Sequence, residues 1–219
     1  PGRLLISVGP FEAGRGLELL VRAFAASVGQ REDWTLVLVG SGSLRGRLVT
    51  LATRLGIAAR VRLLDYPPAE ELAGLLGAAT LFALPAEDER GRGVQLARAL
   101  ACGLPVLVAD LPRYRFRFAP GVEGLAVPPG DLGAWAGALG RLAQAPELRQ
   151  QMAAAARSLG QRLGWEPAAQ AVVGMERGVL HAQRFEDARG DELLEALSAD
   201  DLDDAPGDGD AEVVFVGAA

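Results

Sequence analysis

The sequence has no lysine and no asparagine, and it contains one histidine, His181, and one cysteine, Cys102. One cysteine excludes an internal disulfide framework and a cysteine-based metal site. With one histidine we expect no metal cluster, and a P-loop lysine and a serine nucleophile elbow are both missing. We assign no catalytic residue and no cofactor from the sequence.

Long apolar runs are also missing. None approaches the ~20 residues that span a bilayer, and the start, PGRLLISVG, has neither a charged n-region nor a cleavage site. A strand is predicted almost at once after Pro1, so we expect that an N-terminal portion is missing. The lone cysteine favours a reducing compartment, and we expect a cytoplasmic protein.

Negative charge is concentrated at one end of the chain. Residues 1–185 hold 21 of the 22 arginines and 16 acidic residues, a net charge of +5, whereas residues 186–219 hold one arginine and 12 acidic residues, a net charge of −11. We therefore predict a domain over residues 1–185 and an acidic, largely flexible tail over 186–219, with a candidate strand at 213–216. A solvated tail and a tail that docks on the basic face of the domain both stay open.

The domain alternates strands with helices. Apolar runs bounded by Gly or Pro predict strands at 4–9, 34–40, 61–65, 80–85, 105–110 and 124–129. Helical spacing and start or stop signals predict helices at 17–28, 44–55, 69–79, 93–102, 132–145, from Pro146 onward, and at 167–185. The helix at 132–145 is expected to be capped by Asp131. This order predicts an α/β fold: a Rossmann-like parallel sheet of about six strands with helices on both faces.

Ligands of such sheets bind at the carboxyl ends of the strands, at a topological switch point. The loops to inspect are therefore 9–16, 40–43, 65–68, 85–93 and 110–120. Glycine turns that run into helices suit phosphate, because the helix start offers free N–H groups and a partial positive charge. The candidate ligand-binding residues in these loops are Gly9, Arg15, Gly16, Ser41, Gly42, Arg90, Gly91, Gly93, Val94 and Arg98.

Two of these candidates are arginines in the stretch RGRGVQLARALACG (90–103). Arg98 has apolar neighbours in sequence, so we expect it to be partly buried, where it needs an anionic partner or several hydrogen-bond acceptors. A ligand anion is one such partner, and an ion pair with Glu87, Asp88 or Glu89 is the other.

Basic and aromatic residues alternate in LPRYRFRFAP (111–120), a pattern that occurs in nucleic-acid contacts. An extended segment with one apolar and one solvated face is the interpretation we prefer, and the mildly basic domain argues against nucleic acid as a partner. A membrane surface stays open as a partner, but no feature of the sequence supports it.

Several pieces, in order and at family spacing, resemble one known domain. They are ISVGPFEAGRGLELLVRAF, LVLVGSGSLRGRL, RVRLLDYPPAEELAGLLGAATLFALP, GRGVQLARALACGLPVLVAD and GLAVPPGD. From about residue 3 to residue 183 the chain resembles the C-terminal, nucleotide-sugar-binding domain of retaining GT-B glycosyltransferases of group 1 (family 4). The resemblance implies one half of a GT-B fold, with the N-terminal acceptor domain absent from this chain or supplied by a partner protein.

The resemblance also implies roles for single positions. The family's two basic diphosphate-binding positions are Pro10 and Arg15 here, so one charge is kept. The family's two donor-loop glutamates fall on Arg90 and Arg98. Two hypotheses follow: a divergent transferase domain that binds the diphosphate of a nucleotide-sugar, or an inactive transferase-like scaffold or regulatory subunit. We expect the isolated chain not to turn over.

Overall fold

The computed structural model describes residues 2–29, 31, 33–87, 93–115 and 117–162. In chain order the elements are β1 (Arg3–Val8), α1 (Leu17–Ser27), β2 (Trp34–Val39), α2 (Arg45–Arg54), η1 (Ala58–Arg60), β3 (Val61–Leu64), α3 (Ala69–Ala78), β4 (Leu81–Leu84), α4 (Val94–Ala101), β5 (Val106–Ala109), α5 (Pro112–Arg115), β6 (Gly124–Val127), α6 (Leu132–Gln144) and α7 (Pro146–Arg162). No helix in these ranges is long and apolar enough to cross a membrane.

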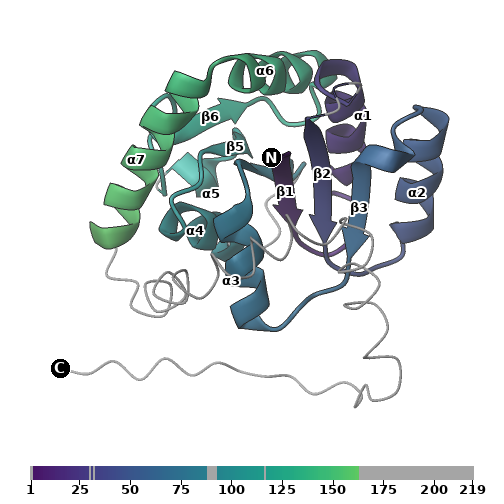
Figure 1. Cartoon of the computed structure of the whole chain (residues 1–219), viewed down its shortest axis with the longest axis horizontal. Coiled ribbons are helices and arrows are strands. Elements are labelled where there is room, and N and C mark those ends of the chain that lie inside the picture. Colours follow the sequence, from purple (N-terminus) through teal and green to yellow (C-terminus); the bar gives the residue numbers. More distant parts are fainter. Residues whose placement is uncertain (1, 30, 32, 88–92, 116, 163–219) are drawn as a thin grey trace.

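The strands form one parallel sheet in the order β3-β2-β1-β4-β5-β6 (Figure 1). Leu5 of β1 lies opposite Leu36 of β2 on one side and Leu81 of β4 on the other. The chain first builds outward from β1 to β3 and then crosses back to β4, which makes the gap between β1 and β4 the topological switch point. The predicted six-stranded, Rossmann-like sheet is confirmed.

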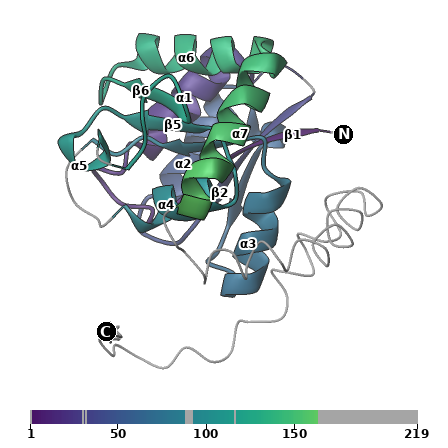
Figure 2. The ribbon, with the colours of Figure 1, turned by 90° about the vertical axis from the view of Figure 1, so that its left-hand side faces the viewer.

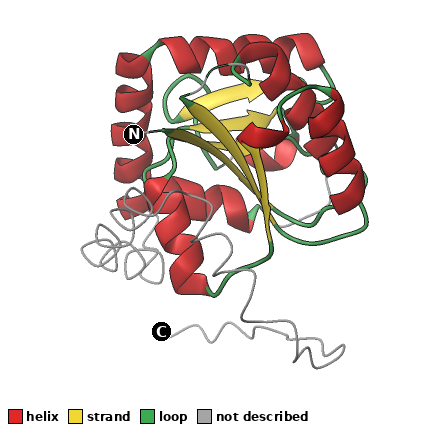
Figure 3. Ribbon diagram, turned by 45° about the vertical axis from the view of Figure 1, so that its right-hand side comes forward, coloured by secondary structure: helices red, strands yellow, loops and turns green. Residues whose placement is uncertain are grey.

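Helices cover both faces of the sheet (Figure 3). Right-handed crossovers place α1 and α2 on one face and α3 and α4 on the other, because the strand order runs in opposite directions in the two halves. The last two helices tie the faces together: α6 packs along α1, and α7 packs along α4 (Figure 2). The core between these layers is closed by the fully buried Trp34, Trp135 and Phe24.

The predicted helix start at Asp131 is confirmed, since its carboxylate accepts a hydrogen bond of 2.9 Å from the Ala134 backbone N–H. The other end of α6 is capped from α7. The buried Arg149 donates to the carbonyls of Leu142 and Ala143, and its guanidinium carbon lies 5.9 Å from the centre of a Trp34 ring. The predicted helix at 167–185, the domain boundary at 185 and the tail with its strand at 213–216 lie outside the described residues.

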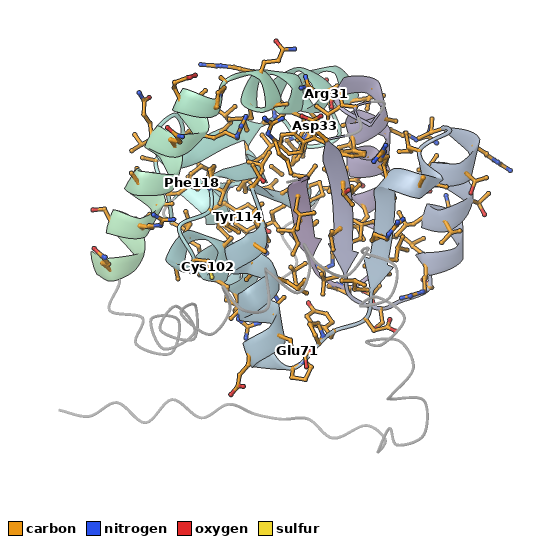
Figure 4. The ribbon with its side chains drawn as sticks, in the orientation of Figure 1. Arg31, Asp33, Glu71, Cys102, Tyr114 and Phe118 are labelled. Carbon is orange, nitrogen blue, oxygen red and sulfur yellow. The ribbon has the colours of Figure 1, made fainter. Side chains whose placement is uncertain are left out.

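The prediction of an extended segment after the fifth strand is wrong. Residues 112–115 form the short helix α5, and Tyr114 and Phe118 are buried (Figure 4). Tyr114 lies in the helix and Phe118 lies in the turn that follows it, so the two rings are not buried on one face of an extended segment. Arg115 points away from the core and pairs with Asp110, at 2.8 Å between its Nε and a carboxylate oxygen.

Candidate functional site

A cleft of about 200 Å³ opens at the switch point, at the carboxyl ends of β1 and β4. Its lining comes from the ends of these two strands, the starts of α1 and α4, the loop after β3 and a side chain of α5. The lining residues are Ser7, Val8, Gly9, Pro10, Arg15, Leu17, Tyr66, Leu84, Pro85, Ala86, Gly93, Val94, Gln95 and Tyr114. The cleft therefore lies where the topology of an open parallel sheet places a ligand.

The start of α1 is pressed against the loop that follows β4. Gly16, the N-cap residue of α1, has φ of 67°, and a Cβ built on it would lie 1.7 Å from the carbonyl oxygen of Pro85. Next to it, the Glu87 N–H donates to the Gly14 carbonyl over 2.9 Å. Only glycine combines this backbone conformation with this close approach. Gly16 thus lets the loop after β1 pack directly against the loop after β4, and it does not itself line the cleft.

The loop after β2 supports the first loop from behind. The Phe11 N–H donates to the Ser41 carbonyl over 2.7 Å, and the Phe11 carbonyl accepts from the Leu44 N–H over 2.9 Å. A Cβ on Gly42 would lie 2.6 Å from the Phe11 carbonyl oxygen. Phe11 itself is fully buried. Ser41 and Gly42 therefore hold the loop that carries Arg15, and neither lines the cleft.

The start of α4 forms another wall. Gly93 is its N-cap, with φ of 68°, and no side chain caps the helix start. Val94, the first residue of the helix, is 45% exposed. The Arg117 side chain lies over this start, since a Cβ built on Gly93 would be 3.0 Å from its Nε. The uncapped N–H groups of the helix start give this wall a partial positive charge.

Tyr66 and Gln95 meet across the cleft. The Gln95 amide nitrogen donates to the Tyr66 hydroxyl over 3.2 Å, and the Gln95 amide oxygen accepts from Arg98 over 3.5 Å. Burial raises the pKa of Tyr66, and the hydrogen bond from Gln95 and the charges of Arg98 and Arg15 partly oppose that rise. Arg98 and Arg15 thus act electrostatically on the same phenol.

The expectation that Arg98 is partly buried is wrong, because the residue is exposed. Its buried neighbours Leu96, Ala97 and Leu100 form one stripe of α4, and residue 98 projects from the other side of the helix at 100° per residue. Arg98 donates to the Gln95 amide oxygen, and none of the ion pairs between described residues includes it. Two of the carboxylates expected as its partner, Asp88 and Glu89, lie outside the described residues.

The structure brings four of the ten predicted site residues to the cleft: Gly9, Arg15, Gly93 and Val94. Four others lie outside its lining: Gly16, Ser41, Gly42 and Arg98. Arg90 and Gly91 lie outside the described residues. Sequence reasoning missed Tyr66, Gln95 and Tyr114. The loop at 65–68 was among those to inspect, so the position of Tyr66 after a strand was the available signal.

An open parallel sheet with a cleft between two helix starts at its switch point defines a Rossmann-like domain. The sequence profile of the glycosyl transferases group 1 matches residues 2–159, which is most of the chain. This chain belongs to the group 1 glycosyl transferases, as its sequence motifs predicted.

Individual relatives agree with this assignment. The D-inositol 3-phosphate glycosyltransferase of Frankia alni is 34% identical over 192 residues, which cover 84% of this chain and 45% of the relative. The structure of sucrose-phosphate synthase from Thermosynechococcus elongatus is 29% identical, with a TM-score of 0.67 over 83% of this chain and 46% of that one. The chain spans less than half the length of these relatives.

The same fold occurs at lower identity. Anabaena HepE, solved in complex with UDP, is 20% identical to this chain and superposes with a TM-score of 0.65, over 77% of this chain and 49% of that one. The predicted GT-B half is confirmed by these structural neighbours.

Proposed function

We propose that this domain binds the diphosphate of a nucleotide-sugar in the switch-point cleft and thereby serves as the donor-binding half of a glycosyltransferase. The observation that carries the proposal is the pairing of two helix starts, α1 and α4, on one cleft. Each has a glycine N-cap with positive φ and no side-chain cap. The nucleotide-sugar is a substrate in this proposal, and no resident cofactor is required.

The electrostatics favour an anion. Each helix start carries roughly half a positive charge and N–H groups without an intrahelical partner. Arg15 lines the cleft between them, and Arg117 lies over the start of α4. A diphosphate can accept hydrogen bonds from both helix starts and from a guanidinium, which is why glycine loops at helix starts recur in phosphate sites.

The size of the cleft suggests that a second domain completes it. At about 200 Å³ it falls below the roughly 300–1,000 Å³ typical of small-molecule sites. The relatives are more than twice as long as the matched part of this chain. We therefore propose that an acceptor-binding domain, in a longer chain or a partner protein, forms the opposite wall, and that the isolated chain binds donor without turnover.

The hydrogen bonds of Arg98 support donor binding over the scaffold hypothesis, because they connect this arginine to the cleft. Arg98 is exposed and donates to the Gln95 amide oxygen, and the Gln95 amide nitrogen donates to the hydroxyl of Tyr66, which lines the cleft. The UDP in HepE supports a uridine nucleotide as the first ligand to test. The cytoplasm, suggested by the single cysteine, is the compartment that we propose.

Calorimetric titration of the full chain with UDP, GDP and ADP at two salt concentrations tests the proposal. We expect micromolar binding of one nucleotide that weakens as salt rises, because the contacts are ionic. Arg54→Ala, on the exposed end of α2, is the matched control for a lost positive charge and should bind like wild type. No binding of any nucleotide at millimolar concentration would overturn the proposal.

A further inference from the structure

One wall of the cleft is an exposed aromatic ring. Tyr66, in the loop after β3, lines the cleft and is still 46% exposed. Its hydroxyl is tied to α4 through Gln95, and Gln95 is tied to Arg98 one turn further along the same helix. These three side chains form one hydrogen-bonded row from the surface of α4 into the cleft.

Donor and acceptor chemistry fixes the polarity of this row. A guanidinium has only donors, so the group that Gln95 turns toward Arg98 is its amide oxygen. The amide NH₂ then faces Tyr66 and donates to the phenol oxygen. A phenol has a single proton, and since its oxygen already accepts from Gln95, that proton is left to donate to an acceptor atom of a ligand.

We propose that Tyr66 contacts the nucleoside part of the nucleotide through its ring and hydroxyl, and that Arg98 is a positioning residue that acts on Tyr66 through Gln95. This inference rests on the proposed function, because it takes the ligand of the cleft to be a nucleotide.

The distribution of charge in the cleft separates the two ends of such a ligand. Arg15 and the glycine-capped starts of α1 and α4 suit the diphosphate. Tyr66 lies beside the flank of α4, level with Gln95, and offers a ring face of a kind that packs against flat base and sugar surfaces. The hydroxyl then donates to a base carbonyl or a ribose oxygen.

UDP and inorganic pyrophosphate, titrated separately into the full chain, distinguish the two ends. Tyr66→Phe keeps the ring and removes the hydroxyl. We expect roughly fivefold to tenfold weaker UDP binding and unchanged pyrophosphate binding, because one hydrogen bond is lost at the nucleoside end. Equal UDP affinity in the variant and the wild type would overturn the inference.

The wild-type titrations separate failure of the inference from failure of the proposed function. If pyrophosphate binds and UDP binds no more tightly, the anion site stands and the nucleoside contact is refuted. If neither binds at millimolar concentration, the proposed function is refuted and the inference with it.

A double-mutant cycle tests the role of Arg98. If Arg98 acts through Tyr66, Arg98→Ala weakens UDP binding several-fold in the wild-type background and has little effect in the Tyr66→Phe background. The same loss in both backgrounds would mean that Arg98 contacts the ligand directly, and would overturn its positioning role. Arg54→Ala controls for the change in net charge.

The titration of the phenol gives a readout that altered folding alone does not produce. The charge of Arg98 lowers the pKa of Tyr66, so Arg98→Ala should raise the alkaline midpoint of the ultraviolet tyrosinate signal that Tyr66→Phe abolishes. Arg54→Ala should leave that midpoint unchanged. An unchanged midpoint in Arg98→Ala would show that the two side chains are not coupled.

Discussion

Gly16→Ala should destabilise the domain far more than the same change at Gly56. Both glycines have nearly the same left-handed backbone, with φ of 67° and 70°. A Cβ at Gly16 would lie 1.7 Å from the Pro85 carbonyl oxygen, whereas a Cβ at Gly56 would meet nothing within 4 Å. Comparing the two variants therefore separates the cost of alanine in a left-handed backbone from the cost of a steric overlap with Pro85.

The expected magnitudes follow from these two contributions. Alanine in the left-handed region costs about 1–2 kcal/mol, and loss of the glycine's extra freedom in the unfolded chain returns about 0.4–1 kcal/mol. Gly56→Ala should thus lower the free energy of unfolding by about 1 kcal/mol. In Gly16→Ala the new Cβ also overlaps the Pro85 carbonyl, and only a shift of the α1 start or of the loop after β4 relieves this overlap. The shift should lower the free energy of unfolding by about 1–3 kcal/mol more. Its total loss should be about 2–4 kcal/mol.

Urea unfolding followed by tryptophan fluorescence measures both losses, because Trp34 and Trp135 are buried and change environment on unfolding. Below the unfolding transition, UDP should bind Gly56→Ala like wild type and Gly16→Ala more weakly, since the overlap pushes apart the two loops of the cleft. Equal losses of stability in the two variants would refute the contact between Gly16 and Pro85.

Three further predictions concern single charges and the thiol. Arg15→Ala should weaken UDP binding by roughly tenfold or more and flatten its salt dependence, measured by calorimetry, because a charged hydrogen bond is lost; an unchanged salt slope would contradict this. The hydrogen bond from Arg115 lowers the pKa of Asp110, so the pair stabilises the fold above the unfolded Asp pKa of about 3.9, and this contribution is lost as pH falls through the lower folded value. Arg115→Ala should move the NMR titration of that carboxyl back up, and an unmoved midpoint would show that the pair does not form in solution. Burial raises the pKa of Cys102 to about 11, so alkylation of its thiol at neutral pH should be slow in the native chain and fast in urea; equal rates would place it at the surface.

The sheet was predictable because its signals are local. Each strand is a short apolar run bounded by Gly or Pro, and each predicted boundary falls within one or two residues of the observed one. The capping carboxylate of Asp131 was likewise readable from its place before a helical pattern. Such features depend on neighbours in sequence, which is the information that a single chain provides.

The two wrong predictions have different causes. Arg98 was placed by its apolar neighbours in sequence, but the buried side chains of α4 follow helical spacing, as Leu96 and Leu100 do, and this period turns residue 98 outward. After the fifth strand, the spacing of four between Tyr114 and Phe118 fits a strand face as well as a helical face, so the period of the aromatic residues did not reveal the short helix.

The composition of the cleft required the fold. Tyr66 and Gln95 are 29 residues apart in sequence, and no spacing rule joins the loop after a strand to the first turn of a helix three elements later. The sheet order brings Tyr66 and Gln95 together, and Arg98 is then linked through Gln95 to the cleft, which the sequence did not show. A guanidinium has no acceptor atom, so Arg98 cannot accept hydrogen bonds as a carboxylate does, but it can hold the Gln95 amide so that the NH₂ group faces Tyr66. In our proposal the basic residue at position 98 is therefore compatible with nucleotide binding, because Tyr66, in the loop after β3, makes the polar contact with the nucleoside.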